Sequence, residues 1–192
     1  MGLLQTLLRA PAQIAAITII VLATACDSQS GATRYFPDGA FEENQAKWLS
    51  SLFVALQEPS LFNPESDGAS YRVTSYPGLS YPDLVRIDVD DNGEAVLTHT
   101  IGSFADGSRP GKLSMKEWQE VSDSELEMVT LLFAGLGLCE RPTLDPDEPM
   151  VLDAEILIVE YRKDGEYCIN VRIWNFEPYM PVTAYMSTIA EQ

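Results

Sequence analysis

Two pairs of neighbouring strands, each joined by a tight turn, constrain the fold of this chain more than any other feature. Apolar and polar residues alternate on both sides of a turn in 84–101 and again in 154–174, and Asn92-Gly93 lies in the first turn. Alternation with period two is typical of a half-buried strand, and Asn-Gly is a strong hairpin signal. Because hairpin strands run antiparallel, the sequence predicts an antiparallel sheet.

Residues at helical spacing surround these hairpins. An apolar stripe predicts a helix over 40–57 with Asp38 as its N-cap, and the spacing of Ser122 and Glu125 predicts a capping box at the start of a second helix. A short strand is expected near Trp118. The predicted class is α+β: an antiparallel sheet of about four to six strands built from two hairpins, with two main helices packed on one face and a short C-terminal helix.

The first 25 residues have the organisation of an export signal. Arg9 is the only charge before an apolar stretch that includes Ile14 to Leu22, and small residues follow up to Cys26. A positive charge, an apolar core and small residues in this order are typical of a secretory signal peptide. The apolar run has roughly 12 residues, fewer than the roughly 20 that a bilayer-spanning helix requires.

The end of this segment resembles the lipobox of bacterial lipoproteins, in which a leucine and two small residues precede a cysteine. The matching residues are Ala23-Thr24-Ala25-Cys26, with alanine at the first position and Leu22 one place earlier. In that family the peptide is cut before the cysteine, whose thiol carries fatty acyl chains such as palmitate. The resemblance implies a mature protein held on a membrane by lipid on Cys26.

This resemblance divides the chain into a signal peptide (1–25), a lipidated cysteine with a flexible tether (26–39) and a single globular α+β domain (40–192). Removing residues 1–25 from the 192-residue chain leaves 167, enough for one compact core. In the enterobacterial pattern an aspartate at the position of Asp27 favours the periplasmic side of the inner membrane over the outer membrane. A secreted protein cut near Ala25 and an uncleaved anchor helix remain alternatives.

The chain is strongly acidic, and this limits its partners. It has 29 acidic and 12 basic residues, a net charge of −17, which becomes −18 when Arg9 leaves with the signal peptide. Such a charge repels phosphate backbones, so no nucleic-acid partner is expected, and it favours cationic partners.

Three cysteines are present, and lipid on Cys26 leaves Cys139 and Cys168 as a pair. An exported chain folds in an oxidising compartment, so we expect these two to form a disulfide. The alternative is two buried thiols that do not meet. Their wide spacing and the presence of a single histidine argue against a metal site.

The C-terminal part also resembles a pattern found in small uncharacterised bacterial proteins. That pattern has a glutamate, a glycine turn, Tyr-His, Arg-Trp and a proline. The matching residues are Glu160, Gly165, Tyr167, Arg172, Trp174 and Pro178. Cys168 stands where the pattern has histidine, and the resemblance implies no activity.

Few residues suggest chemistry. The most specific motif, Asp88-x-Asp90-x-Asn92-Gly93, fits the start of an EF-hand calcium loop, but His99 occupies the position of the bidentate glutamate. We therefore interpret it as a hairpin turn and predict no metal. His99 is interpreted as structural, because the sequence contains no nucleophile motif.

One surface candidate remains. Arg172 and Trp174 share a strand face, and they form an exposed recognition patch if the opposite face is the core.

The expected function is that of a non-enzymatic, membrane-anchored envelope lipoprotein without a cofactor, which binds or supports an envelope protein. Two alternatives are an acidic inhibitor or immunity-type protein against a cationic envelope protein or toxin, and an enzyme that uses carboxylates. A scaffold is expected to expose an apolar patch or a sheet edge, and an inhibitor an acidic rim around a protruding loop. An enzyme is expected to contain a deep pocket with converging polar groups.

Overall fold

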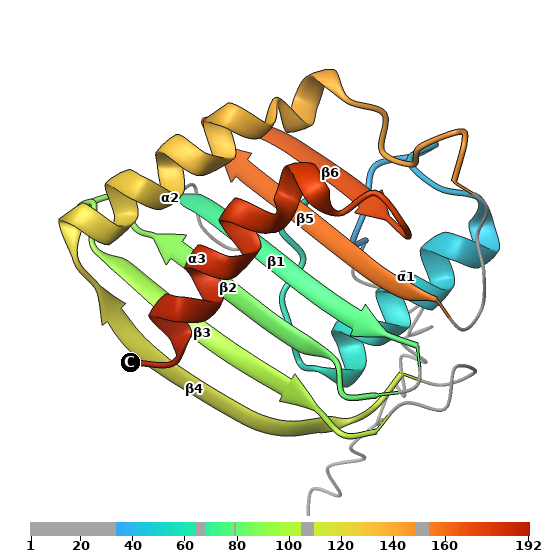
Figure 1. Cartoon of the computed structure of the whole chain (residues 1–192), viewed down its shortest axis with the longest axis horizontal. Helices are drawn as coiled ribbons and strands as arrows, with labels where there is room; N and C mark the ends of the chain where they lie inside the picture. Colours follow the sequence, from blue (N-terminus) through green and yellow to red (C-terminus); the bar gives the residue numbers. More distant parts are fainter. Residues whose placement is uncertain (1–33, 64–67, 79, 105–109, 149–153) are drawn as a thin grey trace, which may run out of the picture. The chain divides into compact units, whose positions relative to one another are not determined.

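The computed structural model describes residues 34–63, 68–78, 80–104, 110–148 and 154–192 (Figure 1). The expected signal peptide, Cys26 and residues 26–33 of the tether lie outside the described residues. Within the described ranges, no helix combines the length and the apolar composition needed to span a membrane.

Six antiparallel strands form one sheet in the order β4-β3-β2-β1-β5-β6, which confirms the predicted α+β class (Figure 1). The strands are β1 (Ala69–Pro77), β2 (Asp83–Val89), β3 (Ala95–Gly102), β4 (Leu113–Val121), β5 (Glu155–Lys163) and β6 (Glu166–Arg172). The two predicted hairpins are β2–β3 and β5–β6, and β1 joins them by pairing with both β2 and β5. The strand expected near Trp118 is β4, which is nine residues long.

Three α-helices accompany the sheet. They are α1 (Glu43–Ala55), α2 (Asp123–Leu136) and α3 (Met180–Ala190), with short 3-10 turns η1 (Leu138–Glu140) and η2 (Glu177–Tyr179). The capping box of Ser122 and Glu125 at the start of α2 is confirmed. The cap predicted at Asp38 is wrong, because α1 begins later with a box formed by Glu42 and Gln45, while Asp38 pairs with Arg34.

The helices cover both faces of the sheet. Helices α2 and α3 share one apolar core with residues such as Val73 and Val85, whereas α1 shares a second core with Tyr76 and Leu84 (Figure 1). The expectation that both main helices lie on one face therefore differs from the structure. The reason is that β1 and β5 each contain a run of consecutive buried residues, so their side chains are buried on both faces of the sheet. One layer of helices cannot cover two faces.

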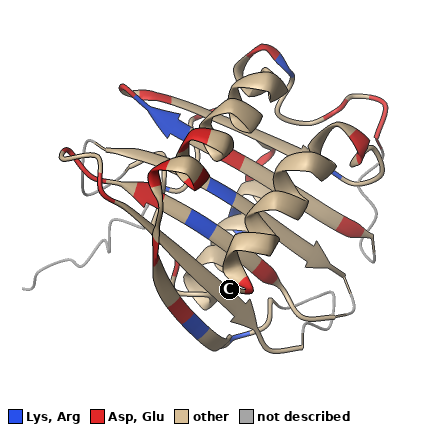
Figure 2. Ribbon diagram, turned by 60° about the vertical axis from the view of Figure 1, so that its left-hand side comes forward, with Lys and Arg blue, Asp and Glu red and all other residues tan. Residues whose placement is uncertain are grey.

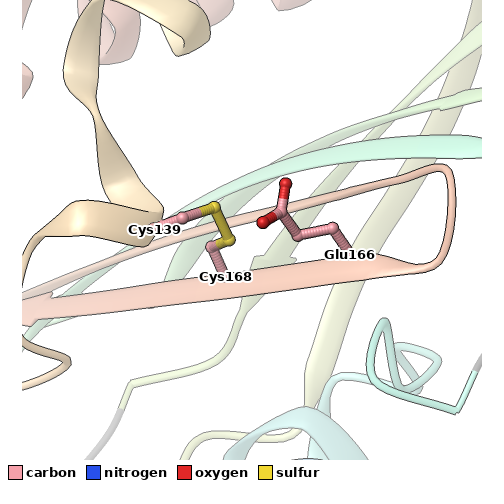
Figure 3. A group of neighbouring side chains, drawn as sticks. All are labelled: Cys139, Glu166 and Cys168. Atoms are coloured by element: carbon pink, nitrogen blue, oxygen red, sulfur yellow. A yellow bond between two sulfur atoms is a disulfide. The ribbon is translucent and has the colours of Figure 1, made fainter.

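A disulfide joins η1 to β6 and confirms the predicted pair. Cys139 and Cys168 lie 29 residues apart in sequence, with their Cα atoms 5.1 Å apart (Figure 3). The segment that follows η1 then runs beside β6, where the N–H of Val171 donates to the carbonyl of Thr143 at 2.7 Å. The disulfide and this segment hold the end of α2 against β6.

We expect Cys139→Ser to lower the free energy of unfolding by roughly 3–4 kcal/mol, because an open loop of this length regains chain entropy when the protein unfolds. Cys139 is exposed, so the substitution removes little packing. Urea unfolding measures the effect, and the wild-type protein in reductant is the matched control. Thiol labelling of the oxidised, unfolded wild-type protein tests the pairing itself. Labelling of both Cys139 and Cys168 would contradict it.

Candidate functional site

Strand β4 forms one border of the sheet and presents the most exposed aromatic residue in the described structure. Among the described residues β3 is the only strand that pairs with β4, whereas β6 at the other border is lined by the segment after η1. Trp118 lies in the middle of β4 and is 76% exposed. A border strand whose outer edge has no neighbouring strand among the described residues, and which carries an exposed tryptophan, is a surface on which a second polypeptide can be held.

Side chains of β4 alternate between the two faces of the sheet. Lys116 and Trp118 lie opposite Thr100 and Thr98 of β3, on the face that α1 covers, and Glu120 follows on the same face. Glu117 points to the other face. We call Val96, Glu117, Trp118 and Glu120, all exposed, the edge patch.

A single buried carboxylate fixes the strands beneath this patch. The side chain of Glu58 is fully buried and accepts hydrogen bonds from Arg86 Nε at 2.9 Å, Thr100 Oγ1 at 2.8 Å and Lys116 Nζ at 2.7 Å. These three donors belong to β2, β3 and β4. Glu58 therefore ties three neighbouring strands to the chain that leaves α1.

The backbone after α1 places Glu58 in this position. Gln57 adopts a left-handed conformation with φ 54°, and the N–H of Glu58 then returns to the carbonyl of Phe53 at 2.9 Å. A left-handed residue reverses the chain just after a helix end. The chain turns down onto the sheet there, and the carbonyl of Gln57 accepts a further bond from Lys116 Nζ at 2.8 Å.

A second buried ion pair lies in the centre of the same face. Arg72 and Glu160 have fully buried side chains and form two hydrogen bonds, Nε to Oε2 at 2.6 Å and Nη2 to Oε1 at 2.8 Å. The guanidinium also donates to the carbonyl of Pro59 and lies over the ring of Phe53, and Tyr167 donates to Glu160 at 2.7 Å. Charges removed from water are stable only when paired and hydrogen-bonded in this way.

Burial and the neighbouring charges shift the pKa values of Glu58 and Tyr167. Burial alone raises the pKa of Glu58, but the charge of Arg86 and the hydrogen bond from Lys116, together with Arg72, outweigh it and lower that pKa below its ordinary 4.5. Burial and the charge of Glu160 raise the pKa of Tyr167 well above its ordinary 10.0. At neutral pH Glu58 is thus a carboxylate and Tyr167 a neutral donor.

The recognition patch predicted at Arg172 and Trp174 does not form, because only Trp174 is exposed. Arg172 is 4% exposed, and its guanidinium donates to the carbonyls of Pro142 and Thr143 beside η1. The strand face that carries Arg172 is covered by the segment after η1 and by Tyr179. Trp174 lies beyond the end of β6 and is 63% exposed.

The weak calcium candidate forms a turn whose carboxylates are engaged within the chain. Asp88 pairs with Arg86 and accepts a bond from Ser70 at 2.8 Å. Asp90 accepts bonds from the backbone N–H groups of Asn92 at 2.9 Å and Glu94 at 2.8 Å. This is the hairpin turn that the sequence indicates.

Two other groups have candidate chemistry. His99 Nε2 lies 2.9 Å from Asp83 Oδ1. Within the described part of the chain, one group has the spacing of metal ligands, Cys139, Cys168 and Glu166 (Figure 3). Its two sulfurs are bonded to each other, so neither is available as a thiolate.

The open groove beside α1 does not gather free polar groups, whereas a smaller groove beside β4 is acidic. An open groove of about 910 Å³ runs between residues 34–41 and α1, but its charges pair with each other as Arg34 with Asp38 and Lys47 with Glu43. A smaller groove of about 400 Å³ lies next to the edge patch and is lined by Glu94, Glu120 and Asp123. Figure 2 shows basic residues in the middle of the sheet and acidic residues toward strand ends and loops.

No protein-family model and no curated protein matches this chain, so its site is interpreted from geometry alone. That geometry defines a sheet border held rigid from beneath by buried ion pairs. Sequence reasoning missed Glu58, Arg72 and Arg86. Arginines at inward positions of otherwise apolar strands could have indicated buried ion pairs. The sequence does not identify their partners, because Glu58 lies 28 residues from Arg86 and Glu160 lies 88 residues from Arg72.

We expect Glu58→Gln to lower the free energy of unfolding by about 3–5 kcal/mol, because Arg86 and Lys116 lose the charge that compensates them. The lowered pKa makes the ionised Glu58 stabilising above about pH 4.5, and this stabilisation is lost as the pH falls through the pKa in the folded state. Unfolding followed between pH 7 and pH 3 measures both effects.

The Glu58→Gln variant should therefore lose less stability than the wild type on acidification. Glu127→Gln is the matched control, since Glu127 is an exposed carboxylate on α2. Equal acid sensitivity of the wild type and Glu58→Gln would contradict the role of Glu58.

Proposed function

We propose that this chain is a lipid-anchored protein of the bacterial cell envelope that acts as a non-enzymatic binding module. The observation that carries the proposal is the pairing of Cys139 with Cys168, which leaves Cys26 as the remaining one of three cysteines. A stable disulfide fits an oxidising compartment, and the remaining cysteine follows an export signal directly.

The exposed border of the sheet supports a binding role. Strand β4 and Trp118 fit the sheet edge expected of a scaffold, and the paired charges of the groove beside α1 do not fit an active site with converging free groups. The chain from Cys26 to Arg34 can extend at most about 28 Å, so the tether holds the domain near the lipid surface.

An acidic inhibitor is the second candidate, and one observation favours it. Glu94, Glu120 and Asp123 line a groove at the β2–β3 turn, where Asp90 and Asp91 are exposed. This is the acidic rim beside a protruding turn that an inhibitor of a cationic protein needs. The binding module and the inhibitor both bind a partner protein. Only the inhibitor is expected to abolish an activity of that partner.

We expect Cys26→Ser to abolish lipid attachment and to leave the signal peptide uncut or cut elsewhere, because lipid is attached to the thiol. Protein that is cut elsewhere should leave the membrane fraction. Cell fractionation and mass spectrometry of the N-terminal peptide measure the two effects. Ser28→Ala is the matched control and should stay with the membrane fraction. A Cys26→Ser protein that fractionates and matures like the wild type would refute the anchor.

A further inference from the structure

We infer that β4 is the binding site for an extended, basic segment of a partner protein, which adds to the sheet as a further strand beside β4. The inference rests on the proposed binding function and names the chemistry of the partner. Three observations carry it: an open strand edge, the position of Lys116, and the arrangement of Trp118 with the acidic residues.

The edge of β4 is long, and its pairing with β3 departs from a regular register only at Ile101/Gly102. Sheets normally limit pairing at their borders with short edge strands, prolines or outward lysines. Strand β4 has nine residues and no proline, and among the described residues it pairs only with β3. Its backbone can therefore form a ladder of hydrogen bonds with an added strand.

The only lysine of β4 is directed away from the edge. The ammonium of Lys116 contacts the buried Glu58 Oε1 at 2.7 Å and the carbonyl of Gln57 at 2.8 Å. Its charge is thereby neutralised within the protein. The charges that remain on the exposed part of β4 are the carboxylates of Glu117 and Glu120.

These carboxylates define what kind of strand fits. Glu117 and Glu120 point to opposite faces, so an added strand meets a negative charge on each face. Glu94 and Asp123 continue the negative surface at the end of β4. A strand with basic side chains is attracted at each of these positions, whereas an acidic strand is repelled.

Trp118 supplies the apolar part of the recognition. It lies two residues before Glu120 on the same face of the sheet, beside Thr98, and is free to contact a new neighbour. A lysine or arginine of the added strand can place its aliphatic stem and its charge over the indole ring while it approaches Glu120. The pairing of an exposed tryptophan with a nearby carboxylate thus favours a cation.

The test uses the full-length protein in detergent micelles and three nine-residue peptides. In the first peptide lysine alternates with valine, in the second the lysines are replaced by glutamates, and the third is the basic peptide with N-methyl groups on consecutive residues. The third peptide keeps the charge but cannot donate a full ladder of hydrogen bonds from either of its edges. Calorimetry measures affinity, and amide hydrogen exchange locates the bound peptide.

We expect the basic peptide to bind and to slow exchange in residues 113–121, the acidic peptide not to bind, and the N-methylated peptide to bind at least about tenfold more weakly. Trp118→Ala and Glu120→Gln should each lower the affinity for the basic peptide by about threefold to fivefold. Glu127→Gln removes the same charge on α2 and should leave affinity unchanged. Trp118 and Glu120 are exposed, and circular dichroism checks that their variants fold.

Three results would each overturn the inference: no binding of the basic peptide, equal binding of the N-methylated peptide, or slowed exchange confined to the turn 90–94. The last two would mean that charge alone attracts the peptide. Failure here with an intact membrane anchor refutes only the strand addition. Peptide binding by a Cys26→Ser protein that still matures unchanged refutes only the anchor.

Discussion

The carboxylate of Glu58 is the interaction on which the arrangement of the sheet depends. Its side chain is fully buried and is compensated by Arg86, Thr100 and Lys116 from three strands. An uncompensated charge at such depth costs several kcal/mol, so the strands and the chain after α1 hold each other in one register. The same contact pairs the charge of Lys116 with a buried carboxylate, so the core influences the electrostatic character of the exposed edge.

Local patterns in the sequence predicted the elements better than their assembly. The turn at Asn92-Gly93 and the cap at Ser122 are determined by neighbouring residues, and both appear where expected. The position of α1 on the second face depends instead on β1 and β5, which are buried on both sides, and strand alternation alone does not reveal this. Arg172 was misjudged for a related reason, because its cover comes from a segment about 30 residues earlier.

The candidate site was the least predictable part of the structure. A border strand can be recognised only when the order of all six strands is known, and that order follows from pairing β1 with β5 across 78 to 92 residues of chain. The exposure of Trp118 and the contact of Lys116 with Glu58 both follow from this order. A sequence reader sees a tryptophan, a lysine and two glutamates in one segment and cannot assign them to the surface or the interior.

The pairing of β1 with β5 has a consequence for the order in which the chain folds. Arg72 finds its counter-charge at Glu160, 88 residues further along, so the middle of the sheet cannot close until most of the chain is available. On the proposed export route, the first strands emerge from the translocation channel while their neighbour is still inside the cell. If the chain takes that route, its sheet can close only after translocation. Until then Arg72 lacks its counter-charge, and both apolar faces of the sheet are incomplete.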